Sequence, residues 1–206
     1  MAEWQSRSAH DARLNAMDFR DGLMIALLAL CPIRLENLAS IVIGRHLTFQ
    51  EGRPRLSFQA DEMKGKRPLE FDLPETLHDA IDRYLGSIHP TLYTGGQHEA
   101  PLWPSLAKGK PQMSAHGIYT RITQVTEKHL GHSVNPHMFR DAAATFIVEL
   151  APEHAMMAAA VLQHTSLQIT MRHYVHGQQH LAAHKYHAAI DDLIARVAAE
   201  PFDLRE

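Results

Sequence analysis

The stretch Pro136-His-Met-Phe-Arg140-Asp-Ala-Ala-Ala-Thr145 decides how this sequence is interpreted. It lies at the start of a helix that we predict over about 137–150, and it places His137 and Arg140 three residues apart. A His-x-x-Arg pair on its own carries almost no information. Its meaning depends on what stands before and after it in the chain.

Two further segments follow in a specific order. They are Leu162-Gln-His164-Thr-Ser-Leu167 and Thr170-Met-Arg-His-Tyr174-Val-His176. Together with His137 and Arg140 they resemble the signature of tyrosine recombinases of the phage-integrase type. In that family His-x-x-Arg opens a helix, a Leu-Gly-His element follows, and a tyrosine comes next, although Gln163 stands here in place of the glycine.

The resemblance continues upstream and covers about 17–190. Cys31-Pro-Ile-Arg34-Leu-Glu-Asn37-Leu-Ala-Ser-Ile41 is similar to the family's first-arginine motif, with Asn37 where a glutamate is usual. The turn containing Lys64-Gly-Lys66-Arg67 is similar to its lysine hairpin. The family therefore implies a site-specific DNA recombinase that cuts and rejoins strands through a 3′-phosphotyrosyl intermediate.

Physical chemistry assigns a task to each residue of the phosphate site. Phosphodiester cleavage builds negative charge on the non-bridging oxygens, and guanidinium groups bind such oxygens in pairs. We expect Arg34 and Arg140 to clamp the scissile phosphate and His164 to donate a further hydrogen bond. For each arginine alone, a structural ion pair would be the ordinary interpretation.

Proton transfer requires the remaining residues. Tyr174 is the expected nucleophile, because a site dense in positive charge favours the phenolate. His137 would accept or shuttle the phenol proton, and Lys64 on a mobile hairpin would protonate the 5′-hydroxyl leaving group, with Lys66 as its rival. This chemistry requires no cofactor and no metal.

The predicted fold is α+β, mainly helical, with a small three-stranded antiparallel sheet. Hydrophobic spacing predicts a helix over Met17–Leu30 that stops near Pro32, a second over 34–42 and, after the sheet, another that opens at Pro74. The stretch 86–111 is expected to be a long loop, with Ser114 capping a helix over 115–130. Further helices are expected near 152–163, 166–173 and 178–199, and the strands near Leu47–Phe49, Arg55–Phe58 and Leu69–Leu73.

We expect residues 1–16 to be a tail or linker remnant and residues 17–206 to be the catalytic domain. Members of the family normally carry an N-terminal core-binding domain that closes a clamp around DNA, and we expect none before residue 17. The resemblance further implies double-stranded DNA sites as partners and a homotetramer on DNA. The helix at 178–199 would then pack against a neighbouring protomer.

Composition sets limits on these expectations. The chain has 206 residues, of which 45% are hydrophobic and 21% charged, enough for a substantial core. Its net charge of −3 argues against DNA binding, although 16 histidines can add positive charge near a polyanion. Cys31 is the single cysteine, which excludes an internal disulfide, and the sequence has no apolar signal or membrane segment, so we expect a cytoplasmic protein.

Three alternatives stay open at this point. A type IB topoisomerase would share the tyrosine chemistry but relax supercoils. A catalytically silent DNA-binding module would have kept the motifs without the activity. A zinc-binding protein would use the histidines of the predicted C-terminal helix face, namely His176, His180, His184 and His187.

Overall fold

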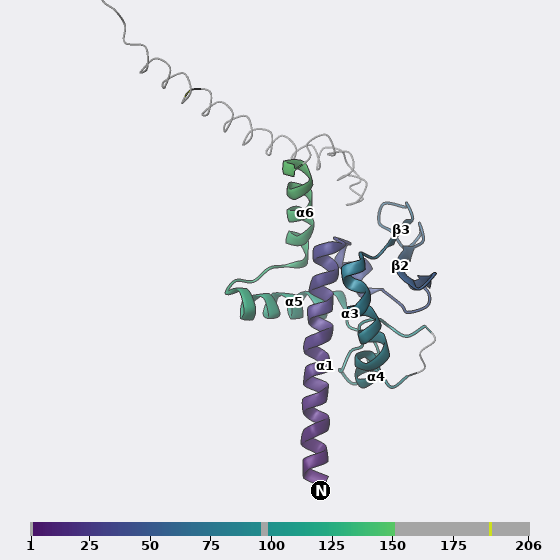
Figure 1. The fold of residues 1–206 in the computed structure, drawn as a ribbon, viewed down its shortest axis with the longest axis vertical. Coiled ribbons are helices and arrows are strands. Elements are labelled where there is room, and N and C mark those ends of the chain that lie inside the picture. Colours follow the sequence, from purple (N-terminus) through teal and green to yellow (C-terminus); the bar gives the residue numbers. More distant parts are fainter. Residues whose placement is uncertain (1, 96–98, 151–189, 191–206) are drawn as a thin grey trace, which may run out of the picture. The chain divides into compact units, whose positions relative to one another are not determined.

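The computed structural model describes residues 2–95, 99–150 and 190 (Figure 1). The chain divides into two compact units, Met1–Asp141 and Ala142–Glu206, and we describe the first. The helices expected after residue 151 lie outside the described residues. In chain order the elements are α1 (Ala2–Leu30), α2 (Leu35–Ala39), β1 (Leu47–Gln50), β2 (Arg53–Phe58), β3 (Leu69–Asp72), η1 (Glu75–Leu77), α3 (His78–Arg83), η2 (Tyr84–Ile88), α4 (His89–Leu92), α5 (Ala115–Leu130) and α6 (Pro136–Leu150).

Helix α1 is the central element of the first unit, with α5 crossing it on one side and α3 and α4 on the other (Figure 1). Its core face is made by Met24, Leu27 and Leu28, which are fully buried. The helix begins at Ala2 rather than at Met17, so the segment that we expected to be a tail is helical. Residues 10–15 are all exposed, which explains why the sequence shows no apolar periodicity there.

The three-stranded antiparallel sheet is confirmed, in the order β1-β2-β3. Alternate residues of β2 face the core, and among them Leu56 and Phe58 are buried. Arg55 lies on the opposite face, where it pairs with Asp72 at 2.6 Å and with Glu70 at 2.7 Å across the strands. The sheet therefore has one apolar and one charged face, as alternation predicts.

The segment after the sheet is more regular than we expected. The predicted helix at Pro74 starts as the 3₁₀ turn η1 and continues through α3, the π-helical η2 and α4. The stretch 86–111 is therefore not simply a loop. Tyr84 donates to the carbonyl oxygen of Leu102 at 2.7 Å, and His89 Nε2 donates to that of Pro101 at 2.8 Å. These bonds fold the segment back onto the core, where Trp103 is fully buried.

Local capping signals set the bounds of the next two helices. The Ser114 hydroxyl accepts from the Gly117 amide at 3.1 Å, so the predicted cap and the predicted range of α5 are confirmed. Asn135, which we did not predict as a cap, accepts from the amides of His137 and Met138 at the start of α6. Among the described helices, none combines the length and apolar character needed to cross a membrane.

Candidate active site

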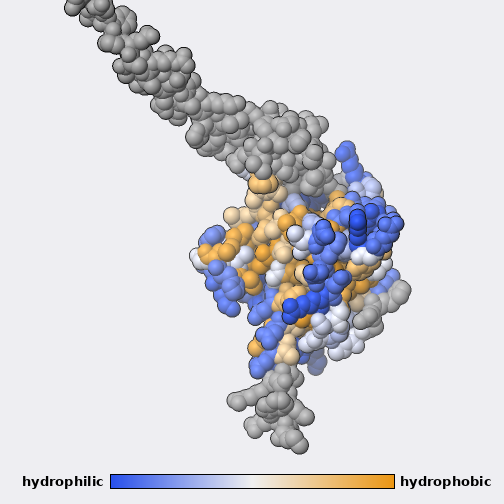
Figure 2. Space-filling view, in the orientation of Figure 1, coloured by the Kyte–Doolittle hydropathy of each residue, from blue (hydrophilic) through white to orange (hydrophobic). Residues whose placement is uncertain are grey.

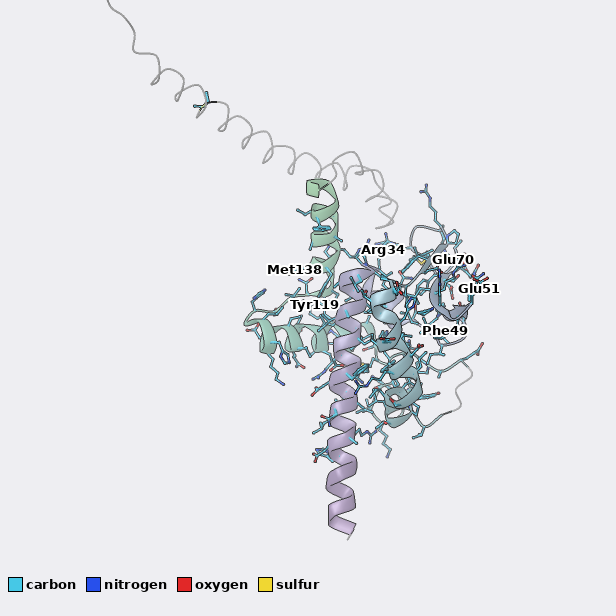
Figure 3. The ribbon with its side chains drawn as sticks, in the orientation of Figure 1. Arg34, Phe49, Glu51, Glu70, Tyr119 and Met138 are labelled. Atoms are coloured by element: carbon cyan, nitrogen blue, oxygen red, sulfur yellow. The ribbon has the colours of Figure 1, made fainter. Side chains whose placement is uncertain are left out.

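Arg34 and Arg140 lie together, although they are far apart in the sequence. Arg34 is the N-cap residue of α2, in extended conformation, just beyond the C-terminal end of α1 (Figure 3). Arg140 lies on α6, is 7% exposed, and donates from its guanidinium to the carbonyl oxygen of Pro32. The side chain of Arg140 therefore lies against the segment that precedes Arg34.

The electrostatics of Arg140 reflect this arrangement. Burial, followed by the positive charge of Arg34, lowers the pKa of Arg140 to about 10, although the Asp141 carboxylate acts in the opposite direction. Burial and a nearby like charge both disfavour the charged form of a cation. The pair is therefore suited to binding a phosphate, whose oxygens accept from two guanidinium groups at once.

The short helix α2 is held in place by side chains from distant segments. Trp103 Nε1 donates to the carbonyl oxygen of Leu38 at 2.8 Å, and Gln112 Nε2 donates to that of Ala39. Carbonyl groups in the last turn of a helix have no partner within the helix, so these bonds satisfy them. They give rigid support to the turn that begins at Arg34.

The two candidate lysines lie on the turn between β2 and β3, as predicted. Lys64 and Lys66 are both exposed, and hydrophilic side chains gather over this part of the described surface (Figure 2). Lys66 has a φ of 51° and its Nζ lies 3.4 Å from the carbonyl oxygen of Asp61, within the same turn. Between them and β2, Met63 is buried and its Sδ accepts from Asn37 Nδ2 at 3.1 Å.

His137 lies in the first turn of α6, one turn before Arg140 on the same helix. Its ring is exposed, and Nε2 is 4.0 Å from the Asp141 carboxylate. The structure thus brings together Arg34 and Arg140 and places His137 on the helix of the second arginine. The other two predicted site residues, His164 and Tyr174, lie outside the described residues, as do the four histidines of the zinc alternative.

A family model described as the phage integrase family matches residues 5–180. The chain belongs to the phage integrase family. No curated protein sequence matches this integrase-family chain. Among solved structures, it is similar to the XerH site-specific recombinase bound to a difH substrate in a pre-cleavage complex, with a TM-score of 0.59 and 18% identity over 84% of this chain and 50% of the other.

Two further structures share the fold of this integrase-family chain. A post-cleavage complex of XerH with a palindromic difH substrate has a TM-score of 0.62 and 19% identity, over 86% of this chain and 51% of the other. The XerA recombinase has a TM-score of 0.61 and 17% identity, over 87% and 62%. The chain thus spans about half to three fifths of the length of these relatives. The mainly helical fold with a three-stranded antiparallel sheet is confirmed.

Several residues that shape the site of this integrase-family chain were missed by sequence reasoning. They are the Pro32 carbonyl, the Asn37–Met63 contact, and Trp103 with Gln112 behind α2. All are contacts between residues far apart in the chain. The one available signal was Asn37 itself, which stands where the family usually has a glutamate.

Proposed function

We propose that residues 17–206 form the catalytic domain of a site-specific DNA recombinase that forms a 3′-phosphotyrosyl intermediate. The observation that carries this proposal is the adjacency of Arg34 and buried Arg140, because two neighbouring guanidinium groups are suited to bind one phosphate. Membership of the phage integrase family supports it. The DNA substrates named for XerH support double-stranded DNA as the partner.

The proposed reaction is an exchange of phosphodiester bonds. The Tyr174 oxygen attacks the phosphorus, a bond forms between them, and the bond from phosphorus to the 5′-oxygen breaks. Arg34, Arg140 and His164 stabilise the charge that develops on the non-bridging oxygens. Attack by the hydroxyl of another strand reverses the step and releases Tyr174.

Two protons move in this step. His137 accepts the phenol proton, directly or through water. Its ring, at the start of α6, is exposed to solvent rather than packed in the core. Lys64 delivers a proton to the departing 5′-oxygen. Lys66 is the rival donor, although its contact with the Asp61 carbonyl favours a role in holding the turn. Charge stabilisation by guanidinium groups makes the proposed reaction independent of metal ions.

The proposed assembly is a homotetramer on paired DNA sites. The predicted helix at 178–199 would pack on a neighbouring protomer through its apolar residues Ile190, Leu193, Ile194 and Val197. The core-binding half of the DNA clamp is expected to come from outside residues 17–206. The proposed site of action is the cytoplasm.

The test is covalent trapping. A random-sequence library of nicked duplexes is incubated with the chain in low salt and EDTA, and protein-linked DNA is recovered under denaturing conditions and sequenced. We expect an adduct that requires Tyr174, is lost in Tyr174→Phe, and maps to one phosphate. DNA binding without an adduct in either variant would overturn the proposal.

A second experiment separates a recombinase from a topoisomerase. It measures strand exchange between two mapped sites beside the relaxation of supercoiled DNA.

A further inference from the structure

We propose that Asn37 is a positioning residue that holds the lysine turn against the helix that follows Arg34. The inference rests on the proposed function, in which a lysine of this turn protonates the leaving group. It concerns a residue that touches neither the phosphate nor the leaving oxygen. Asn37 acts through Met63, the residue directly before Lys64.

The contact between the two residues is buried and directional. Asn37 Nδ2 donates to Met63 Sδ over 3.1 Å, and the two residues are 5% and 2% exposed. A buried amide needs a hydrogen-bond partner, and a thioether sulfur is a weak acceptor that a flexible side chain can bring into place. The bond therefore selects one position for Met63 rather than adding much stability.

The position of this bond in the chain gives it a consequence for the site. Asn37 lies one helical turn after Arg34 in α2, whose far end is held by Trp103. Met63 is linked to Lys64 by a single peptide bond. One hydrogen bond thus connects the segment that carries a phosphate-binding arginine with the segment that carries the candidate acid.

The same turn has a second, independent attachment. The Glu62 carboxylate accepts from the Gln59 amide at 2.8 Å and from His46 Nε2 at 3.0 Å, and it also pairs with Arg45. His46 Nδ1 accepts from the Val42 amide, so Nε2 carries the proton. These bonds keep the turn folded when Asn37 is changed. Loss of the Asn37 bond should therefore move Lys64 without unfolding the hairpin.

The expected kinetic effect follows from the geometry of proton transfer. A general acid contributes about 10²- to 10⁴-fold to a rate, and a displacement of about 1 Å can cost a large part of that contribution. Asn37→Leu keeps a side chain of similar size against Met63 but replaces the amide, and with it the N–H donor, by an apolar group. We expect it to slow cleavage about 10- to 100-fold, less than loss of the acid itself.

The experiment compares two leaving groups at the phosphate mapped by trapping. One duplex has the natural 5′-oxygen, and the other has a bridging 5′-sulfur, which leaves as a thiolate and needs no acid because a thiol has a pKa of about 8.5. The variants are Asn37→Leu, Met63→Leu, Lys64→Ala and Lys66→Ala, with Glu70→Gln on the outer face of the hairpin as the matched control. Thermal unfolding and DNA binding are measured for each.

We expect Asn37→Leu and Met63→Leu to be slow on the oxygen duplex and close to wild type on the sulfur duplex, with Glu70→Gln unaffected on both. Equal slowing on the two duplexes, or no slowing, would overturn the role of Asn37. If a lysine variant is rescued by sulfur while Asn37→Leu is not, this inference alone fails. If neither lysine variant is rescued, the proposed general acid fails and the inference fails with it.

Discussion

The guanidinium of Arg140 donates a hydrogen bond to the carbonyl oxygen of Pro32, two residues before Arg34. This bond joins the start of α6 to the chain that enters α2, and it brings two cations into one site. Burial and the nearby charge of Arg34 lower the pKa of Arg140, so both disfavour the charged form of its guanidinium. A strongly lowered pKa of a buried cation beside a like charge is typical of a functional site.

The two arginines should not tolerate lysine. Arg34→Lys and Arg140→Lys keep a positive charge but lose the planar pair of donors, so we expect the rate of Tyr174 adduct formation to fall about 10²- to 10³-fold. The measurement is the single-turnover rate on the trapped duplex. Arg55→Lys, on the outer face of the sheet with Asp72 and Glu70, is the matched control and should keep the wild-type rate. Activity retained in Arg140→Lys would contradict the proposed clamp.

Inorganic phosphate should stabilise the folded chain through the same pair. A ligand that binds only the native state raises the melting temperature, and phosphate would relieve the unfavourable proximity of Arg34 and Arg140. We expect a rise with phosphate over chloride at equal ionic strength, and a smaller rise in Arg34→Gln. Equal shifts in the wild type and Arg34→Gln would place phosphate binding elsewhere.

The Asp21 carboxylate should be essential for stability rather than for chemistry. It is fully buried, accepts from Arg20 at 2.8 and 3.0 Å, and accepts from Arg121 of α5 at 2.7 Å. Asp21→Ala leaves the buried guanidinium group of Arg20 and the partly exposed one of Arg121 without this carboxylate, so we expect a loss of about 3–5 kcal/mol in urea unfolding. The exposed Asp18→Asn is the control and should stay within about 0.5 kcal/mol. A small effect of Asp21→Ala would show that α1 and α5 are held by packing alone.

Two glycine-to-alanine changes should have opposite signs. Gly131 ends α5 with a φ of 74°, so Gly131→Ala should destabilise by about 1 kcal/mol. Gly22 is exposed within α1, and a Cβ there meets nothing within 4 Å. Gly22→Ala should therefore stabilise by about 0.5–1 kcal/mol. The melting temperatures of the two variants provide the comparison, and a stabilising Gly131→Ala would contradict the left-handed cap.

The turn attachment through Glu62 should depend on pH. The hydrogen bond from His46, followed by that from the Gln59 amide, holds the pKa of Glu62 below its ordinary value of 4.5. A carboxylate with a lowered folded pKa stabilises the fold above pH 4.5, and this contribution is lost as the pH falls below that value. We expect the wild type to exceed Glu62→Gln in melting temperature near neutral pH, with the gap narrowing below pH 4.5. A gap that does not change with pH would exclude the ionised carboxylate as its cause.

Local patterns were enough to predict part of this molecule. The alternation around Leu56 predicted the sheet, and Ser114 predicted the start of α5, because a strand period or a cap depends on residues close together in the chain. The order of the motifs along the chain likewise predicted Arg34 and Arg140 as site residues. Their roles, and those of His164 and Tyr174, stay predictions.

Tertiary structure alone decided how the parts are joined. The adjacency of Arg34 and Arg140, and the Asn37 bond to Met63, connect residues that no local period relates. The helical start of α1 was hidden because its exposed residues require no apolar stripe, and Trp103 was hidden because its partner is the Leu38 carbonyl in a distant helix. Sequence patterns record which faces are buried, whereas the partners of those faces are set by packing of the whole chain.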